Sequence, residues 1–285
     1  MTKKYSIFLT VLFCAYLGGI LVVSLLLPKQ AFSPLENRYL QKPPVLRAST
    51  LQSGQFMEDA EQYVSDHIAG RDLWVALKAW CERLSGKREN NGVYFGKQDT
   101  LINRVDPPDF DKLTQSMGYL NALADNVSVP VYLGLIPSAA AIWVDRLPAG
   151  APTADEPSII GSLYGSAKTA TVDLTGALAA HSGEDLYYRT DHHWTSLGAY
   201  YGANALLEAM GLEPLELDAA AKTTVTDQFY GTTFSSSGVR WIPPDSIDRY
   251  ISADGIKVTS YFTATPSQGS LYVDRFLMEK DKYSY

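Results

Sequence analysis

The stretch Tyr187-Tyr188-Arg189-Thr190-Asp191-His192-His193-Trp194-Thr195-Ser196-Leu197-Gly198 decides how this chain of 285 residues is interpreted. It holds two of the four histidines, with a carboxylate directly before them and two hydroxyls shortly after. Apolar residues then recur at helical spacing over residues 197–210, which predicts a helix capped by Thr195 or Ser196. The Asp-His-His-Trp turn therefore lies just before a helix N-terminus, where backbone N–H groups favour negative charge.

Three interpretations of this turn compete. Asp191 and His193 are two residues apart, so in an extended turn their side chains point to the same side. The carboxylate can then orient one imidazole nitrogen while the other faces a serine. A metal site is the second interpretation, but only His67 and His181 remain as further imidazoles, without supporting Cys or HxxxH spacing. The third is a structural polar turn, and His67 and His181 are assigned packing or capping roles.

Composition and charge exclude some classes of protein. Three of the 24 basic residues and none of the 31 acidic residues lie in residues 1–30, which leaves the rest of the chain with a net charge of −10. Nucleic-acid binding needs clustered Lys and Arg, so no nucleic-acid partner is expected. The two cysteines, Cys14 and Cys81, cannot form a disulfide framework.

The N-terminal residues 1–30 are interpreted as a signal anchor. Residues 6–27 carry no charge, and at ~1.5 Å per residue their 22 positions give about 33 Å of helix, enough to cross a bilayer. A cleaved signal peptide is the alternative, but its apolar region usually has about 7–15 residues. Lys3 and Lys4 favour a cytoplasmic N-terminus. We therefore expect a single-pass membrane protein whose C-terminal domain is extracytoplasmic.

The remaining chain is predicted to form an extended linker and helical segment over residues 31–90, then an α/β domain over residues 91–285. Residues 129–137 form a continuous apolar run, as expected of a buried strand in a parallel sheet, and follow an amphipathic helix at 110–124. Residues 186–188 are predicted to form a further strand that leads to the Asp-His-His-Trp turn.

The C-terminal third of the chain is predicted to consist of loops and hairpins. Residues 230–238 are rich in Gly, Ser and Thr and are predicted to form a loop. Short alternating stretches at 256–259 and 271–273 predict β hairpins. An earlier hairpin is predicted from residues 93–102, directly after the turn sequence Asn90-Asn91-Gly92.

The block Tyr188–Tyr200 resembles the signature of the DHHW protein family, which is similar to the periplasmic alginate O-acetyltransferases and has an SGNH-hydrolase-like fold. The resemblance extends over residues 31–285, and further matching stretches are Glu36-Asn37-Arg38, Ser65–Asp72, Val93–Lys97, Ile136–Ser138, Asp145–Pro148 and Phe229–Thr232. It implies that Asp191 and His193 match the acid and base of the acetyltransferases' Asp-x-His pair. His192 takes the variable middle position and is expected to point toward packing or backbone.

The resemblance also implies a nucleophilic serine in an Asp-Ser block downstream of the histidine. The only Asp-Ser after His193 is Asp245-Ser246, which follows two prolines and is predicted to be a turn. We therefore interpret the chain as a truncated SGNH-hydrolase-like domain: a parallel sheet flanked by helices, incomplete at the C-terminus. Without a serine, acyl transfer loses its covalent step, so little or no activity is expected and the chain's status as an enzyme stays open.

Two hypotheses from different classes follow. The first is a membrane-anchored, extracytoplasmic SGNH-like protein whose family role is O-acyl transfer to, or deacylation of, a cell-envelope polysaccharide. The second is a non-catalytic envelope or carbohydrate-binding protein, for which 18 tyrosines and five tryptophans offer stacking surfaces. The Asp-His-His phosphoesterases share only the tripeptide. The expected partners are the membrane and an envelope polysaccharide, and neither a cofactor nor a metal is expected.

Overall fold

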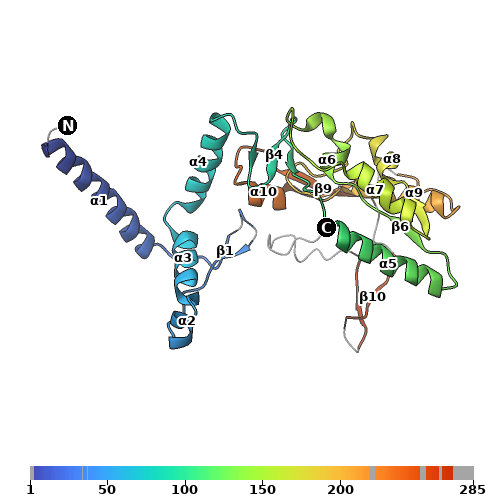
Figure 1. The fold of residues 1–285 in the computed structure, drawn as a ribbon, viewed down its shortest axis with the longest axis horizontal. Helices are drawn as coiled ribbons and strands as arrows, with labels where there is room; N and C mark the ends of the chain where they lie inside the picture. The colour runs from blue at the N-terminus through green and yellow to red at the C-terminus, as the bar shows by residue number, and fades with distance from the viewer. Residues whose placement is uncertain are drawn as a thin grey trace. The chain divides into compact units, whose positions relative to one another are not determined.

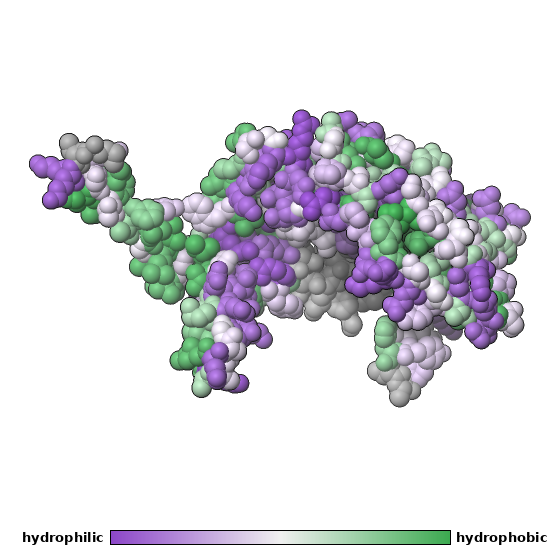
Figure 2. Space-filling view, viewed as in Figure 1, coloured by the Kyte–Doolittle hydropathy of each residue, from purple (hydrophilic) through white to green (hydrophobic). Residues whose placement is uncertain are grey.

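The computed structural model describes residues 3–33, 35–36, 38–217, 222–250, 255–262 and 265–271, which form helices and short strands (Figure 1). The chain divides into two units, Met1–Cys81 and Glu82–Tyr285. The first unit contains α1 (Lys3–Leu26), β1 (Phe32–Ser33), β2 (Arg38–Tyr39), α2 (Ala48–Gln52), α3 (Gln55–His67) and the larger part of α4 (Arg71–Leu84). Helix α1 is long and apolar enough to cross a membrane, and its surface is largely hydrophobic (Figure 2).

Asp66 is the centre of an ion-pair cluster in the first unit. Arg38 contacts both carboxylate oxygens, at 3.0 Å from Nη1 and 2.5 Å from Nη2, and the backbone N–H of Gln41 donates at 2.8 Å. Glu36 pairs with both Arg38 and Arg71, at 2.7 and 2.5 Å. Burial alone would raise the pKa of Asp66, but the bonds from Arg38 and Gln41 outweigh it and lower the pKa to about 2. The matching stretches 36–38 and 65–72 thus meet in one cluster.

The second unit begins with an antiparallel sheet of β3 (Glu89–Asn90), β4 (Val93–Phe95) and β5 (Leu101–Asn103). Asn91 and Gly92, with φ of 52° and 78°, make the turn between β3 and β4. Both angles lie in the left-handed region that Asn and Gly tolerate best. The predicted hairpin over residues 93–102 is confirmed.

Two parallel strands form the α/β part of the second unit. Strand β6 (Tyr132–Gly134) pairs with β7 (Ala170–Val172), which confirms a parallel strand within residues 129–137. The prediction that this strand is buried was wrong, because Tyr132 and Leu133 are only half-buried and Gly134 is exposed. The associated helical elements are α5 (Phe110–Asn126) before β6, α6 (Ala139–Ile142), η1 (Val144–Arg146) and α7 (Glu156–Ser166) in the crossover, and α8 (Leu174–Ala179) and α9 (Ser196–Ala209) after β7. Parallel strands need such a crossover connection, which here is helical.

The remaining elements of the second unit are β8 (Thr223–Phe229), α10 (Thr232–Ser237), β9 (Asp245–Arg249), β10 (Val258–Ser260) and β11 (Ser267–Gly269). Strands β8 and β9 pair antiparallel, as do β10 and β11. The hairpin predicted at residues 256–259 is therefore confirmed. Of the stretch predicted at 271–273, residues 272 and 273 lie outside the described residues.

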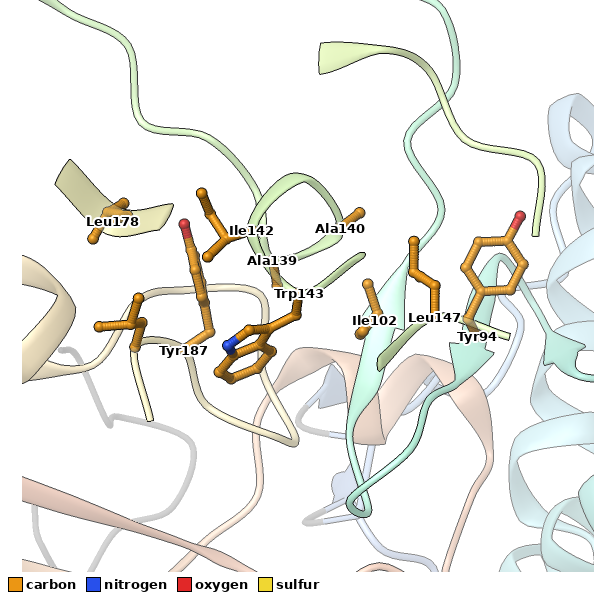
Figure 3. Packing of buried hydrophobic residues seen from close by; sticks show 10 residues of the cluster. Tyr94, Ile102, Ala139, Ala140, Ile142, Trp143, Leu147, Leu178 and Tyr187 are labelled. Carbon is orange, nitrogen blue, oxygen red and sulfur yellow. The ribbon is translucent and has the colours of Figure 1, made fainter. Parts of the chain in front are cut away.

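A hydrophobic cluster behind the Asp-His-His-Trp turn fixes where the turn begins (Figure 3). Tyr187 and Trp143 are fully buried and meet edge to face, with ring centroids 5.4 Å apart. The Tyr187 hydroxyl donates to the carbonyl of Pro137 at 2.6 Å, so its polar end is satisfied inside the cluster. Burial raises the pKa of this hydroxyl, which keeps it protonated. The chain therefore leaves the core at a defined point, a few residues before Asp191.

Replacing Asp66 by Asn should destabilise the first unit, because Arg38 loses its buried partner. We expect a loss of about 3 kcal/mol at pH 7, the lower end for a broken buried pair because Arg38 is partly exposed. The folded-state pKa lies below the ordinary value of 3.8, so the pair contributes fully above about pH 4 and loses its contribution as the pH falls toward 2. The stability difference between wild type and D66N should shrink over that range.

Denaturant unfolding of the full chain in detergent, followed by circular dichroism, measures this difference. The variant E61Q removes an exposed carboxylate from α3, the helix that carries Asp66, and serves as the control. It should unfold like wild type at every pH. An equal loss in D66N and E61Q would contradict the role assigned to Asp66.

Candidate acid–base site

The Asp-His-His-Trp turn is closed by its own backbone. The N–H of Thr195 donates to the carbonyl of Leu186 at 2.8 Å, and the N–H of Tyr188 donates to the carbonyl of His193 at 3.2 Å. Tyr187 and Trp194 form an isolated antiparallel bridge between these two bonds. The prediction of a sheet strand at residues 186–188 was therefore wrong, because this apolar segment pairs within the turn itself.

Helix α9 begins directly after the turn, as predicted. Thr195 is its N-cap, and its hydroxyl oxygen accepts from the backbone N–H of Gly198 at 3.2 Å. A Cβ on Gly198 would lie 2.4 Å from the carbonyl oxygen of Leu186. Only glycine allows this close contact between the first turn of α9 and the segment that enters the site.

Asp191 is buried, with 1% of its surface exposed, and each carboxylate oxygen accepts two hydrogen bonds. Oδ1 accepts from the backbone N–H of His193 at 2.9 Å and from His193 Nδ1 at 2.6 Å. Oδ2 accepts from the backbone N–H of Thr232 at 2.6 Å and from its hydroxyl at 2.9 Å. These four donors compensate the burial of the charge. Asp191 and His193 are thus within hydrogen-bond reach, as their spacing predicts.

The bond to Asp191 fixes the protonation of His193. An ionised carboxylate can only accept, so His193 Nδ1 carries the proton and Nε2 is the basic nitrogen of the neutral ring. The His193 side chain is 47% exposed, whereas that of Asp191 is fully buried. The pair therefore presents an oriented imidazole at the surface of the domain, supported from behind by a carboxylate.

His192 lies beside His193, and the expectation that it points toward packing or backbone was wrong. The two ring centroids are 3.9 Å apart, and both side chains are equally exposed. His192 Nδ1 donates to the Thr232 hydroxyl oxygen at 2.6 Å, while that hydroxyl donates to Asp191. The chain bends at residues 191–193, so the alternation of an extended segment does not apply there.

Thr232 is a site residue that the sequence did not reveal. It lies 40 positions beyond His192 and contacts both His192 and Asp191. The nearest signal is the matching stretch Phe229–Thr232, which marks the segment without indicating that its threonine faces the carboxylate. Gly231 makes the approach possible, because a Cβ there would lie 2.2 Å from the Cβ of Asp191.

Residues 232–237 form helix α10, so the prediction of a loop over residues 230–238 was wrong. The hydroxyls of Ser235 and Ser236 donate to carbonyls one turn earlier, those of Gly231 and Thr232, at 3.0 and 2.9 Å. Short hydroxyl side chains can bond to the helix backbone in this way, which composition alone does not show. Gly238, with φ of 70°, follows the helix as its C-cap.

Asp245 is a second buried carboxylate, and it holds the residues before Asp191. It accepts from the N–H and hydroxyl of Thr190, at 2.8 and 2.6 Å, and from Arg189 Nε at 3.1 Å. Asp245 and Ser246 open strand β9, so the prediction of a turn there was wrong. The bonds to Thr190 and Arg189 fix the start of this strand. The Asp-Ser pair thus contributes a structural carboxylate.

Asp191, His192 and His193 are the described residues that could hold a metal, since one ligand atom from each lies within 4.8 Å of the others. A metal would have to displace hydrogen bonds that both oxygens of Asp191 accept from backbone and side-chain donors. The donor set therefore fits an oriented imidazole better than a metal centre. His67 has a packing role, as predicted, and bonds to the Tyr63 carbonyl. His181 was predicted to be a surface C-cap, but Ala180 caps α8 and the His181 ring stacks on Tyr201.

The second unit contains a parallel strand pair with a helical crossover, and an Asp–His pair just before a helix. Together these features place it among the α/β domains. Residues 128–241 match the family described as ALGX: SGNH hydrolase-like domain, acetyltransferase AlgX. This part of the chain has an SGNH-hydrolase-like fold, and the predicted fold class is confirmed.

Solved structures extend the comparison. A DHHW family protein from Eubacterium siraeum DSM 15702 superposes with a TM-score of 0.50 and 28% identity, over 57% of this chain and 55% of that one. The O-acetyltransferase domain of Pseudomonas putida AlgJ gives 0.42 and 18%, over 63% and 66%. Bacillus cereus PatB1 gives 0.46 and 19%, over 60% and 64%. The chain thus spans about half of the DHHW family protein and less than two thirds of the other two.

The family match over residues 128–241 and the match to the DHHW family protein confirm the predicted resemblance to the DHHW proteins and the O-acetyltransferases. No curated protein is a significant match for the chain.

Replacing Gly231 by Ala should destabilise the second unit, because the new Cβ would overlap Asp191 and push it from its four donors. Overpacking of this kind costs about 1–3 kcal/mol. Denaturant unfolding of the full chain measures the loss. The control is G183A, whose Cβ would have nothing within 4 Å. Unfolding of G231A at the same denaturant concentration as G183A would contradict the close packing of Gly231 on Asp191.

Proposed function

We propose that this chain is a membrane-anchored, extracytoplasmic protein in which Asp191 and His193 are the acid–base pair for O-acyl transfer to, or deacylation of, a cell-envelope polysaccharide. The observation that carries the proposal is the 2.6 Å hydrogen bond from His193 Nδ1 to Asp191. It lies inside residues 128–241, which match an acetyltransferase family. Similarity to the DHHW family protein supports the same assignment.

In the proposed reaction, His193 Nε2 removes the proton from a serine hydroxyl as the serine oxygen attacks the carbonyl of the acyl donor. The donor's leaving group departs with that proton, and the acyl group stays on the serine as an ester. Nε2 then takes the proton of a sugar hydroxyl, which attacks the ester, and returns it to the serine. Asp191 remains ionised throughout and stabilises the imidazolium in both steps. If an acylated polysaccharide is the donor and water takes the place of the sugar hydroxyl, the same steps remove the acyl group from the polysaccharide and release it as a free acid.

The serines near the site do not suit the nucleophile's role. Ser235 and Ser236 give their hydroxyl protons to backbone carbonyls inside α10. Ser246 follows Asp245, whose carboxylate is bound to Thr190 and Arg189. The resemblance implies that the nucleophile is a serine in an Asp-Ser block, placed where a strand ends and a loop begins. We therefore propose that residues 1–285 alone have little acyl-transfer activity.

The proposed location rests on helix α1 and its flanking charges. The helix has 24 residues and is apolar enough along its length to cross a membrane. Lys3 and Lys4 precede the apolar segment, and positive charges favour the cytoplasmic side. The acid–base pair would then face the cell envelope, where a polysaccharide acceptor is found.

We expect the 285-residue chain to hydrolyse a generic acetyl ester slowly or not at all, and S236A to leave that rate unchanged. Fused to a C-terminal segment of a DHHW relative that carries an Asp-Ser block, it should show turnover. Replacing His193 by Ala in the fusion should lower the rate about 10²–10⁴-fold, the usual contribution of a general base. H181A removes an imidazole that stacks on Tyr201 and should leave the rate unchanged.

Two outcomes would count against this assignment. Turnover by the 285-residue chain that S236A abolishes would place the nucleophile in α10. A folded fusion without turnover would favour the carbohydrate-binding alternative.

Helix α1 should hold the protein in the membrane. We expect the chain to stay in the pellet when membranes of expressing cells are extracted with alkaline carbonate, and its mass to include residues 1–30. A variant with Val11→Arg and Leu17→Arg should be extracted, because each charge costs about 2.5–3.5 kcal/mol near the centre of a span. Release of a wild-type form that begins near residue 30 would show that α1 is cleaved.

A further inference from the structure

Helix α4 carries apolar side chains on its exposed side. Leu73, Trp74 and Leu77 are 68%, 40% and 48% exposed, whereas Ala79 is fully buried. At about 100° per residue, the three large side chains fall within an arc of roughly 100°, and Ala79 lies on the opposite side. A surface helix of a soluble domain normally turns such a stripe toward the core. We call Leu73, Trp74 and Leu77 the exposed face of α4. This apolar face points outward, whereas the apolar stripe of such a helix usually points toward the core.

Hydrogen bonds join the start of α4 to the end of α1. The backbone N–H of Ala69, in the turn between α3 and α4, donates to the Ser24 hydroxyl oxygen at 2.8 Å. Trp74 Nε1 in turn donates to the carbonyl of Ala69 at 3.1 Å. His67 Nε2 contacts the carbonyl of Gln30 at 3.2 Å, which is a further tie between the two segments. The first turn of α4 therefore lies beside the last turn of α1.

This connection sets the depth of α4 relative to a bilayer. Ser24 lies in the last turn of α1, near the end of the uncharged residues 6–27. In a membrane-spanning helix, that end lies where the hydrocarbon core gives way to the headgroups. Ala69 is hydrogen-bonded to Ser24, and Trp74 to Ala69, so both lie at the same depth as this end of α1. Tryptophan is enriched at this boundary, because its ring is apolar and its N–H is polar.

We propose that the exposed face of α4 lies on the outer leaflet of the bilayer, so that α1 and α4 form a two-part membrane attachment. The proposal rests on the anchoring role proposed above for α1. Lipid is the occupant that fits, because the apolar face begins at the outer end of the span. Lys78 is exposed at the edge of this face, where its ammonium can reach lipid phosphates, while the acidic Asp72 lies on the other side of the helix.

The test uses the full chain in vesicles of phosphatidylcholine and phosphatidylglycerol, with Cys14 and Cys81 replaced by Ser. A single cysteine at position 77 (Leu77→Cys) carries an environment-sensitive fluorophore, and Leu73→Cys is a second probe of the same face. The control is Asp72→Cys, on the other side of α4. We expect lipids brominated in the upper acyl chain to quench the labels at 77 and 73 several-fold more strongly than the label at 72.

Two other results at position 77 would overturn the proposal. A blue-shifted label that brominated lipid does not quench would mean that protein covers the face. A label that emits as in water would mean that nothing covers it. Alkaline carbonate washing of the same vesicles distinguishes the proposed anchoring by α1 from the proposed lipid contact of α4. If the protein is retained but its labels are not quenched, only the role of α4 is rejected. Released protein rejects the anchoring by α1 and the role of α4 with it.

Discussion

The site depends on the hydrogen bonds that the buried carboxylate of Asp191 accepts. A buried charge is tolerated only when donors replace the water it loses, and four hydrogen bonds do so here. Two donors belong to His193 within the turn, and two belong to Thr232 at the start of α10. Gly231 is needed because a side chain there would occupy the space of the carboxylate. The positions of the turn and of α10 are therefore coupled through one acidic side chain.

The same carboxylate orients both histidines of the turn. His193 is held directly, through Oδ1, and His192 is held one bond further away, through the Thr232 hydroxyl and Oδ2. Both imidazoles therefore keep a proton on Nδ1, and their rings lie side by side at the surface. The residue in the middle of the Asp-x-His pattern is thus part of the network, although the pattern treats this position as variable.

Features that depend on neighbouring residues in the sequence were predicted well. Features that depend on contacts between residues far apart in the chain were not. The cap at Thr195 and the parallel strand within 129–137 follow from neighbours in the chain, and both are confirmed. The apolar run 186–188 has the composition of a strand, but its partner is the far side of the same turn. Thr232 could not be assigned to the site, because a separation of 40 residues leaves no periodic signal. The pairing of Asp191 with His193 was therefore predictable, and its support by Thr232 was not.

The tautomer of His193 is the most direct measure of whether Asp191 controls this site. Long-range ¹H–¹⁵N correlation NMR on histidine-labelled protein, at a pH where the ring is neutral, distinguishes a proton on Nδ1 from one on Nε2. We expect Nδ1–H for His193 in the wild-type chain and a change in its spectrum in D191N, with the signals of His67 and His181 unchanged. An Nε2–H tautomer in the wild type, or a His193 spectrum that D191N leaves unaltered, would contradict the central role of Asp191.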